Sequence, residues 1–462
     1  MTTLSQTQRS GYDALVTNPN GKFGSDRPAL FSPAIAAQEP ANSSQIFYNF
    51  SPILVPFEYT NWVEESRAHT TTCYIGDWTP IGKLLIEGRD ALAFLSYAGV
   101  SKIEPFEIGR VRHHVQVGQE GHVASEGILY RVSEDRFLYT GGGTDYTAWL
   151  LGTGDWDARS VDISAETFLF EIQGPNSLKV MEKALGQNLR DLRFNRGMPV
   201  TLEGVEIRLL RTGISGELGY ELHGPAEHAA RTWQRVVEAG AEFGIKQLGA
   251  ASQLVAHIET GIATTGLDYL PSSVVTPGAQ RLFPKGPLTG SFIPARGVAD
   301  FFRYPGELGW GSRVSLDSHE FQGRAALRAQ AAQGGPERRL MGLEWNFDDV
   351  RRILTAMYDD EFTSPMQIPR TVGVSMDRVL SKGKDVGISS SRTFSASLRK
   401  TISLCVLDKA VQANEMVTVV WGAPGTSQRE VRAEVHELPM KPDRRRTDVA
   451  TDKHGKVSAA PS

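Results

Sequence analysis

The chain has 462 residues, 40% of them hydrophobic, and its 49 Lys and Arg nearly balance 53 Asp and Glu. At roughly 100–200 residues per domain, this length predicts about two to four structural units with buried cores. A net charge of −4 gives no basis for binding nucleic acid or an anionic membrane surface. Only Cys73 and Cys405 are present, no apolar run approaches the ~20 residues that span a bilayer, and the amino terminus lacks signal-peptide features. We therefore expect a cytoplasmic protein without disulfides.

Hydrophobic periodicity and turn residues divide the first half of the chain into alternating strands and helices. Residues 1–50 are rich in Ser, Thr, Asn, Pro and Gly and are predicted to form an irregular arm. Beyond the arm, one predicted helix is capped by Asp90 and another ends at Gly186. The predicted strands of this half cover residues 82–88, 111–117, 128–132 and 168–172.

The second half changes character near residue 283. Before that point, strands within 205–222 precede a helix with one apolar face around Trp233, and a further helix spans about 248–260. Residues 283–298 are rich in Pro and Gly, which indicates a domain boundary. Short strands punctuated by glycine follow to about residue 440, and the remaining residues are predicted to form a solvated tail.

The segment Arg211–Glu221 combines two strands with a turn that contains three glycines, which permit positive φ and close approach to a ligand. Along its second strand, Glu221 and His223 share one face, while Tyr220 and Leu222 share the other. A carboxylate in this position can accept two parallel N–H bonds from a flat, amide-like edge such as that of a pterin ring. A glycine hairpin with a solvated glutamate is the alternative interpretation.

A series of short motifs follows the same order as in one known family. They are D-W-T-P-I-G-K with G-R-D-A (77–83 and 88–91), Q-G-P (173–175), R-T-G-I-S-G-E-L-G-Y-E (211–221) and E-T-G (259–261). Further blocks lie at 308–310, 321–324 and 386–390. Each motif is weak alone, but together they resemble the aminomethyltransferase family, which comprises the T-protein of glycine cleavage and its relatives. The resemblance covers roughly residues 60–425.

This resemblance implies an α+β fold in which three domains form a ring around a central tetrahydrofolate site, with a small C-terminal β-barrel. The first domain of the family is discontinuous in sequence. The expected division is an arm joining the first domain (1–60), a second α+β domain (61–160), the main part of the first, folate-binding domain (161–283), a linker and β-barrel (284–440) and a flexible tail (441–462). The pterin-binding glutamate of the family falls on Glu221. Further candidate contacts with the cofactor are Tyr220, Ile214, Glu171 and Gln173.

Several positions depart from the glycine-cleavage pattern. Ser125-Glu126 replaces an acidic pair, Ile214 replaces the tyrosine of the hairpin turn, and Gln253 and His257 replace two arginines on the last helix. In the family, the lost aspartate serves aminomethyl chemistry. The pattern is therefore closer to the folate-dependent aromatic O-demethylases that act on vanillate and syringate.

The substrate stays open because this chain also differs from the vanillate enzyme. Pro80-Ile81 replaces its paired histidines, Gln253 its tyrosine on the last helix, and Gly142 its carboxylate-binding arginine. The remaining candidate anchors for a substrate carboxylate are Arg110, Arg112 and Arg131.

An aryl methyl ether reacts slowly because its leaving group is a phenolate, whose conjugate acid has a pKa of about 10. Methyl transfer to folate N5 therefore benefits from alignment and from a proton donor to the departing oxygen. Each candidate also has a structural alternative, as a satisfied buried histidine, a surface turn residue or a helix-surface glutamine. The candidate catalytic residues are His257, Gln253, His122, Glu126 and Ser125, with Tyr139 and Tyr146 as further proton donors.

No metal signature is recognised, because the adjacent His113 and His114 would point to opposite faces of a strand. The leading hypothesis is a tetrahydrofolate-dependent O-demethylase of a small methoxylated aromatic compound of the vanillate, syringate or 3-O-methylgallate class. Its products would be 5-methyltetrahydrofolate and a phenol, as in the catabolism of lignin-derived aromatics. The alternatives are an S- or N-demethylase of a small aliphatic donor and a non-catalytic folate-binding protein. The oligomeric state is not predicted.

Overall fold

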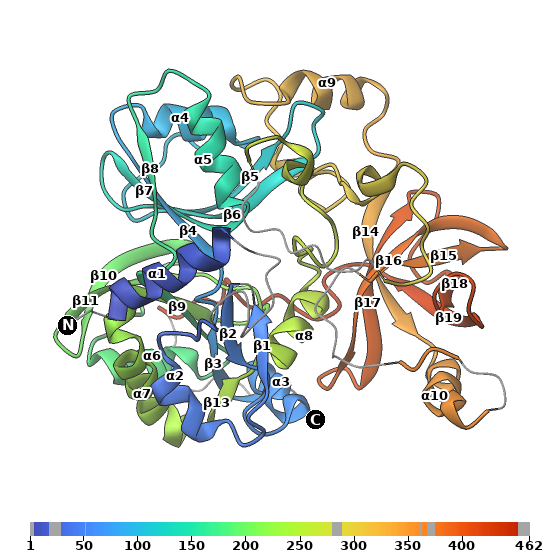
Figure 1. Cartoon of the computed structure of the whole chain (residues 1–462), viewed down its shortest axis with the longest axis horizontal. Coiled ribbons are helices and arrows are strands. Elements are labelled where there is room, and N and C mark those ends of the chain that lie inside the picture. Colours follow the sequence, from blue (N-terminus) through green and yellow to red (C-terminus); the bar gives the residue numbers. More distant parts are fainter. Residues whose placement is uncertain are drawn as a thin grey trace.

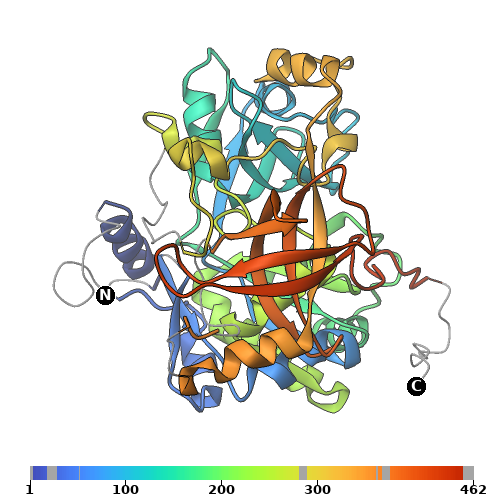
Figure 2. The same ribbon diagram turned by 90° about the vertical axis from the view of Figure 1, so that its right-hand side faces the viewer.

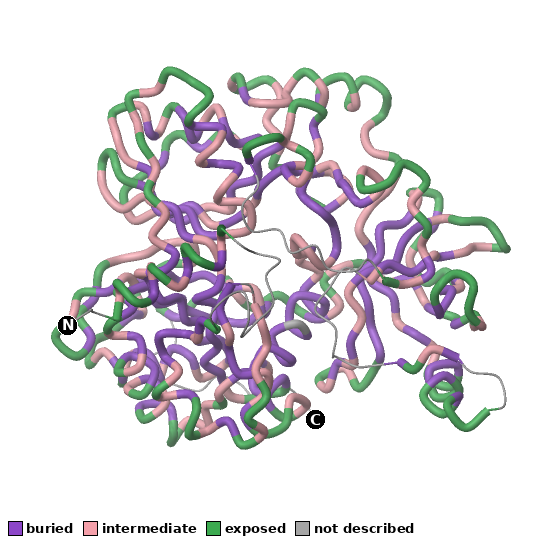
Figure 3. The backbone as a smooth tube through the Cα atoms, viewed as in Figure 1, coloured by how far each residue is buried: buried purple, intermediate pink, exposed green. Residues whose placement is uncertain are grey.

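The structure, a computed structural model, describes residues 4–17, 29–50, 52–279, 289–359, 363–366 and 375–450. Two α+β units lie on one side of the molecule and a closed six-stranded barrel lies on the other (Figure 1). Buried residues are concentrated inside each unit (Figure 3). The mixed α+β fold and the C-terminal barrel agree with the sequence-based expectation. Within the described residues, no helix has the length and apolarity required to cross a membrane.

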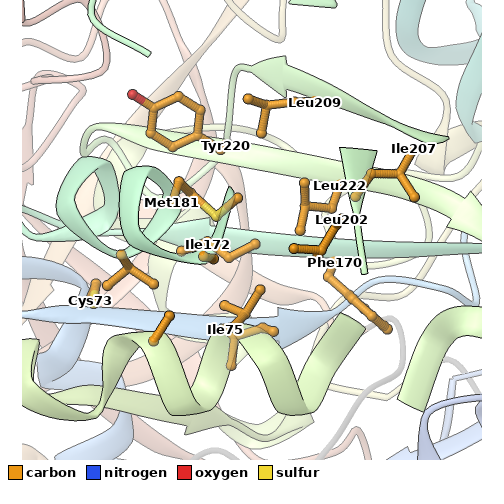
Figure 4. Close-up of a cluster of buried hydrophobic side chains, with 14 of the residues drawn as sticks. Cys73, Ile75, Phe170, Ile172, Met181, Leu202, Ile207, Leu209, Tyr220 and Leu222 are labelled. Atoms are coloured by element: carbon orange, nitrogen blue, oxygen red, sulfur yellow. The ribbon is translucent and has the colours of Figure 1, made fainter. Parts of the chain in front are cut away.

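The first unit is a six-stranded sheet in the order β10-β11-β12-β9-β3-β13. Helices α6 and α7 cover one face, where Met181 and Trp233 pack against Phe170, Ile172 and the neighbouring strands (Figure 4). Only β13 and β3 pair in parallel; the other neighbours are antiparallel. The bounds are β3 Cys73–Asp77, β9 Thr167–Gln173, β10 Arg196–Leu202, β11 Val205–Arg211, β12 Gly219–Pro225, β13 Ile245–Leu248, α6 Ser177–Leu185 and α7 Ala229–Gly240.

The domain boundary that the sequence predicts at residue 61 does not agree with the way the strands pair. Strand β3 pairs with β9 and β13, and α3 (Trp62–Thr71) packs against β3, β13 and α8 (Ala250–Thr260). Residues 62–77 therefore belong to the first unit. The second unit is inserted between β3 and β9, about 20 residues later than expected.

The second unit is a five-stranded antiparallel sheet in the order β5-β6-β7-β4-β8. Helices α4 and α5 pack on it through Phe94, Leu95 and Leu150. Asp90 precedes α4 as predicted, but its carboxylate accepts from the Asp157 backbone N–H (2.9 Å) and makes no cap bond. The bounds are β4 Gly82–Glu87, β5 Val111–Val117, β6 Val123–Arg131, β7 Arg136–Gly142, β8 Arg159–Asp162, α4 Ala91–Ala98 and α5 Thr144–Gly152.

The first and second units are joined by two connections, from β3 to β4 and from β8 to β9, which lie next to each other. The Trp78 N–H donates to the Leu169 carbonyl (2.9 Å), and the Lys83 N–H donates to Ser164 Oγ (2.9 Å). Lys83 is fully buried, and its ammonium donates to the carbonyls of Thr79 (2.6 Å) and Ile81 (2.7 Å). Burial lowers the pKa of this amine to about 7. The Lys83 side chain therefore stabilises the connection between β3 and β4 by binding two of its carbonyl groups.

The third unit is the closed barrel β14-β17-β16-β15-β18-β19, which faces the viewer in Figure 2. Trp345, Val379 and Leu407 are among the residues that fill its interior. Helix α9 precedes the barrel, and α10 follows its first strand. The bounds are β14 Arg338–Trp345, β15 Asp377–Ser381, β16 Lys384–Ser395, β17 Lys400–Asp408, β18 Met416–Trp421, β19 Arg429–His436, α9 Arg324–Ala332 and α10 Phe347–Thr355.

The amino-terminal arm is more regular than its composition predicts. It contains α1 (Leu4–Thr17), the short helix α2 (Ile35–Gln38) and the hairpin β1 (Phe47–Phe50) and β2 (Ile53–Pro56). Tyr12 and Leu15 of α1 are buried in a small apolar cluster. Arg9 Nε donates to Glu166 Oε1 (2.6 Å), which fastens α1 to the loop before β9. Tertiary packing has overridden the weak local signal.

The predicted tail also differs, because residues 441–450 pack against the first unit. Val449 joins the core between the sheet and α6, and the Arg444 N–H donates to the Gly216 carbonyl (2.7 Å). Lys441 Nζ lies 3.1 Å from Glu259 Oε2 at the end of α8. The rest of the predicted tail, 451–462, lies outside the described residues.

Candidate active site

One face of the first sheet carries polar side chains where strands β9 and β12 run side by side. Glu171 and Glu221 are direct antiparallel partners, and only 3% and 5% of their surfaces are exposed. Strand alternation places Gln173 and His223 on the same face. The opposite face of the same strands is the apolar core (Figure 4). The sheet therefore holds two nearly buried carboxyl groups next to each other.

Hydrogen bonds fix these side chains and the loop between β11 and β12. Gln173 Nε2 donates to Glu171 Oε2 (2.6 Å), and its Oε1 accepts from the Ser215 N–H (2.9 Å). His223 Nε2 lies 3.1 Å from Glu221 Oε2. A Cβ on Gly213 or Gly219 would lie only 2.3 or 2.5 Å from the Gln173 side chain. These two positions are therefore occupied by glycine because the Gln173 side chain packs directly against the backbone there. Gly216, at φ +76°, is the one of the three with a positive φ.

The environment acts strongly on one of the two carboxyl groups. Burial, and then the neighbouring Glu221 carboxyl group, raise the pKa of Glu171 well above its ordinary value. The hydroxyl of Tyr74 on β3 lies near Glu171 and Ser215 but forms no well-aligned hydrogen bond with the described residues. The face thus combines two neighbouring carboxyl groups with a buried hydroxyl.

Tyr220 does not share this face, contrary to the predicted cofactor contact. Its ring is buried in the core with Ile172 and Met181, because it alternates with Glu221 along β12 (Figure 4). Ile214 lies closer to the site. Its side chain packs in an apolar cluster that also contains Tyr74. We name this cluster the aromatic wall; it comprises Ala68, Tyr74, Trp78, Ile81, Leu169, Ile214 and Leu248.

Both candidates on α8 make hydrogen bonds within the protein. Gln253 Nε2 donates to the Asp77 carbonyl (3.2 Å) at the end of β3. His257 Nε2 lies 3.2 Å from Ser391 Oγ on β16 and 3.5 Å from Asp268 Oδ2. Burial opposes ionisation of Asp268, but its contacts with His257 and nearby serines lower its pKa. His257 therefore lies in a buried polar cluster, and its contact with Ser391 joins α8 to the barrel.

Ser125 and Glu126 lie on β6 of the second unit, with different partners. Ser125 Oγ donates to the Gly142 carbonyl (3.1 Å) and lies 2.7 Å from the Tyr139 hydroxyl, which must then be the donor in that bond. Tyr146 similarly donates to the Val117 carbonyl (3.2 Å). The protons of Tyr139 and Tyr146 are thus already used, which disfavours both as acids.

Glu126 has partners that the sequence analysis did not propose. Its Oε2 lies 2.9 Å from His113 Nε2, and His113 Nδ1 lies 2.8 Å from the guanidinium of Arg313. Tyr269 is fully buried near Glu126, whose charge adds to burial in raising the Tyr269 pKa well above 10. The hydroxyls of Tyr269 and Thr265 make no well-aligned hydrogen bond with the described residues. The sequence analysis placed His113 on the predicted strand 111–117 but gave no partner for it; Arg313 is 200 residues away.

His122 is placed differently from its neighbour Glu126. Its ring stacks on Tyr304 with centroids 4.2 Å apart and lies 5.9 Å from Phe302. Burial, and then the charge of Arg296, lower its pKa. His122 therefore belongs to the packing between the second unit and the segment that leads to the barrel.

Two of the proposed carboxylate anchors are engaged structurally. Arg112 donates to the carbonyls of Lys102 and Pro105, and Arg131 donates to the carbonyls of Phe106, Ser133 and Glu134. These two arginines hold surface loops of the second unit.

Position 142 has no room for a side chain. A Cβ on Gly142 would lie 2.2 Å from Thr265 Cγ2, so an arginine is excluded there. Within the described residues, no three His, Cys, Asp or Glu side chains gather as metal ligands.

Comparison with known proteins identifies the family. Residues 37–277, just over half of the chain, match the GCVT N-terminal domain. Sesamin methylene transferase of Sinomonas sp. (strain No.22) is 31% identical over 415 residues, covering 83% of this chain and 90% of the relative. Syringate O-demethylase of Sphingobium sp. (strain NBRC 103272 / SYK-6) is 28% identical over 406 residues, covering 83% and 87%. Aminomethyltransferase of Halothermothrix orenii is 26% identical over 360 residues, covering 77% and 90%.

The chain belongs to the aminomethyltransferase family. The crystal structure of aminomethyltransferase T from Bartonella henselae has the same fold, with a TM-score of 0.69 at 19% identity, over 90% of this chain and 99% of that one. As a member of this family, the protein is a tetrahydrofolate-dependent methyltransferase. The acceptor and donor groups on the face of β9 and β12 suit the amide-like edge of the pterin ring.

Proposed function

We propose that this aminomethyltransferase-family enzyme removes the methyl group of a methoxylated aromatic compound, giving 5-methyltetrahydrofolate and a phenol. The observation that carries the proposal is the similarity, over most of both chains, to relatives named for sesamin and syringate, which are both aromatic ethers. The vanillate, syringate and 3-O-methylgallate class is the proposed substrate class. With its cysteines unpaired and buried, the enzyme is proposed to work in the cytoplasm.

In this proposal, Glu221 accepts the paired N–H groups of the pterin, and Glu171 supplies a neighbouring donor. Gln173 holds Glu171 in place through the 2.6 Å hydrogen bond. Bound tetrahydrofolate supplies N5, the nucleophile that accepts the methyl group. Orientation of the donor against that nitrogen can contribute about 7–11 kcal/mol to lowering the barrier.

The aromatic wall supports an aromatic donor over a small charged one. Tyr74 and Trp78 stack with centroids 6.2 Å apart, and a Cβ on Gly76 would lie 2.1 Å from the Trp78 ring. Trp78 therefore requires glycine beneath it on β3. An apolar cluster with two aromatic rings, on the strand next to Glu171, favours a flat ring over dimethylglycine or dimethylsulfoniopropionate.

Protonation of the leaving oxygen is assigned to Glu126. The other candidates, Ser125, Tyr139 and His257, already have hydrogen-bond partners inside the protein. Glu126 also has a partner, because His113 contacts its Oε2, but a carboxyl group has a second oxygen and the Glu126 side chain is 18% exposed. A positioned acid or base of this kind typically contributes 10²–10⁴-fold to the rate.

A second candidate is transfer of a methylene group from a methylenedioxy aromatic. It is favoured by the relative that is 31% identical and named for sesamin. It differs from the first proposal in the product, which would be a methylene rather than a methyl derivative of tetrahydrofolate.

One assay separates these functions. The purified enzyme is incubated with tetrahydrofolate and, separately, vanillate, syringate, 3-O-methylgallate, sesamin, dimethylglycine and dimethylsulfoniopropionate, and both folate products are quantified. Methylfolate formed from methoxyaromatics alone supports the proposal. Product from the aliphatic donors alone contradicts it, and methylenefolate from sesamin alone supports the second candidate. Tight folate binding with no turnover would favour a non-catalytic folate-binding protein.

A further inference from the structure

Hydrogen bonds link Arg313, His113 and Glu126, which come from three different elements of the structure. His113 lies on β5, Glu126 lies on β6, and Arg313 ends the short helix η6 (Gly311–Arg313) after the second unit. Arg313 NH1 is 2.8 Å from His113 Nδ1, and His113 Nε2 is 2.9 Å from Glu126 Oε2. The ring of Trp310 meets His113 edge-on at 5.0 Å. The imidazole is thus held from three directions.

The arginine determines which ring nitrogen carries the proton. A guanidinium has only N–H donors, so His113 Nδ1 must accept, and the proton of the neutral ring must sit on Nε2. That Nε2–H points at Glu126 and donates to its carboxylate. Arg313 therefore fixes the tautomer of His113 that can donate a hydrogen bond to Glu126.

Other titratable groups lie near Arg313 and Glu126. Burial and the charges of Arg445 and Arg446 lower the pKa of Arg313, whereas the Glu126 charge raises it. Tyr139 on β7 and Tyr269 also feel the Glu126 charge, and burial raises the pKa of both phenols. The groups around Glu126 are therefore the His113 imidazole, the Arg313 guanidinium and the phenols of Tyr139 and Tyr269.

We propose that His113, oriented by Arg313, is a positioning residue that holds Glu126 as the proton carrier of the transfer step. This inference rests on the proposed function. As the methyl carbon bonds to N5, the carbon–oxygen bond breaks and its electron pair stays on the phenolate. Glu126 takes the proton released at N5 and returns one proton to the phenolate oxygen. The step balances without an external acid, oxidant or metal.

The kinetic test uses His113→Ala, His113→Gln and Arg313→Gln, with Arg328→Gln as the control. Arg328 is a half-exposed arginine on α9 that pairs with Asp317. For His113→Ala we expect kcat to fall about 10- to 100-fold, as loss of an orienting partner commonly costs, with KM within threefold. The acidic limb of its kcat–pH profile should move to higher pH, because the carboxylate has lost a donor.

Rescue separates positioning from a structural role. The amide nitrogen of Gln can replace the Nε2–H donor, so His113→Gln should recover at least a third of the lost activity and restore the acidic limb. Arg328→Gln should match the unmodified enzyme. Folded variants with an unchanged pH profile, or a glutamine as inactive as the alanine, would overturn the proposal.

A measurement without turnover distinguishes failure of this inference from failure of the proposed function. Nitrogen-15 NMR of the imidazole in the full chain should show the Nε2–H tautomer of His113, and Arg313→Gln should introduce the Nδ1–H form. If the unmodified protein shows Nδ1–H, the proposal is wrong whatever the substrate. If the tautomer is as expected but no methoxyaromatic reacts, the proposed function fails instead.

Discussion

The proposed pterin role of Glu221 gives a quantitative prediction. Glu221→Gln keeps the size of the side chain and one acceptor oxygen, so the contact with His223 at 3.1 Å can persist. The second oxygen becomes an NH₂ group, which cannot accept from the pterin. A hydrogen bond to a charged group is worth about 1.5–3 kcal/mol, so we expect the Kd for tetrahydrofolate to rise about 10- to 160-fold.

Glu221→Ala removes both acceptors and should cost about 3–6 kcal/mol, which abolishes measurable binding in most titrations. It also leaves the fully buried His223 without its partner, so the folded fraction must be checked by circular dichroism. The glutamine variant is therefore the more decisive one.

The assay is anaerobic isothermal titration calorimetry of tetrahydrofolate with the unmodified enzyme and Glu221→Gln. Glu206→Gln is the matched control, because Glu206 is an exposed glutamate on β11 of the same sheet. We expect the control to bind within twofold of the unmodified enzyme. A folded Glu221→Gln variant with a Kd within threefold of the unmodified enzyme would refute the pterin assignment.

Three further predictions concern stability, each read from melting temperatures. Glu171→Gln should raise the Tm, and increasingly so as the pH rises above about 4.5, because a carboxyl whose folded pKa is raised costs stability once the unfolded chain can ionise it; a Tm difference that narrows with pH would contradict this. Glu259→Gln should cost about 3–5 kcal/mol at pH 7, because it leaves Lys441 buried without a counter-charge. Burial acts to raise the Glu259 pKa, but the His69 bond and the Lys441 charge hold it at about 2, so the cost should shrink as the pH falls from 4.5 toward 2. Ending the chain at Met440 should lower the Tm relative to a chain ending at Ala450, because Val449 is a core residue; equal Tm values would contradict the packing of 441–450.

The sequence predicted the local structure of the site better than its long-range contacts. Strand alternation correctly placed Glu221 and Tyr220 on opposite faces of β12. The family resemblance nevertheless made both residues candidate contacts with the cofactor. For Tyr220 the structure follows the alternation, because its ring lies in the apolar core. His113 and Glu126 flank a recognisable hairpin turn, so their contact could have been found by counting residues from the turn.

Other features depend on contacts that no local pattern encodes. Arg313 reaches His113 across 200 residues, and β3 pairs with β9 across about 100. The 441–450 segment has the charged, proline-containing composition of a tail, yet Val449 and Lys441 are buried by partners far away in the chain. Burial of a single side chain in an otherwise polar segment is decided by the tertiary fold, which composition does not reveal.

The insertion of the second unit between β3 and β9 has a consequence for how specificity can change. The two connections around Lys83 and Ser164 run side by side, so the inserted block leaves and rejoins the sheet at one point. The stretch from β4 to β8 carries Glu126 and His113, whereas Glu221 lies outside it. In the proposed assignment of roles, mutations confined to about 80 consecutive codons alter the residues that act on the methyl donor and leave Glu221 unchanged.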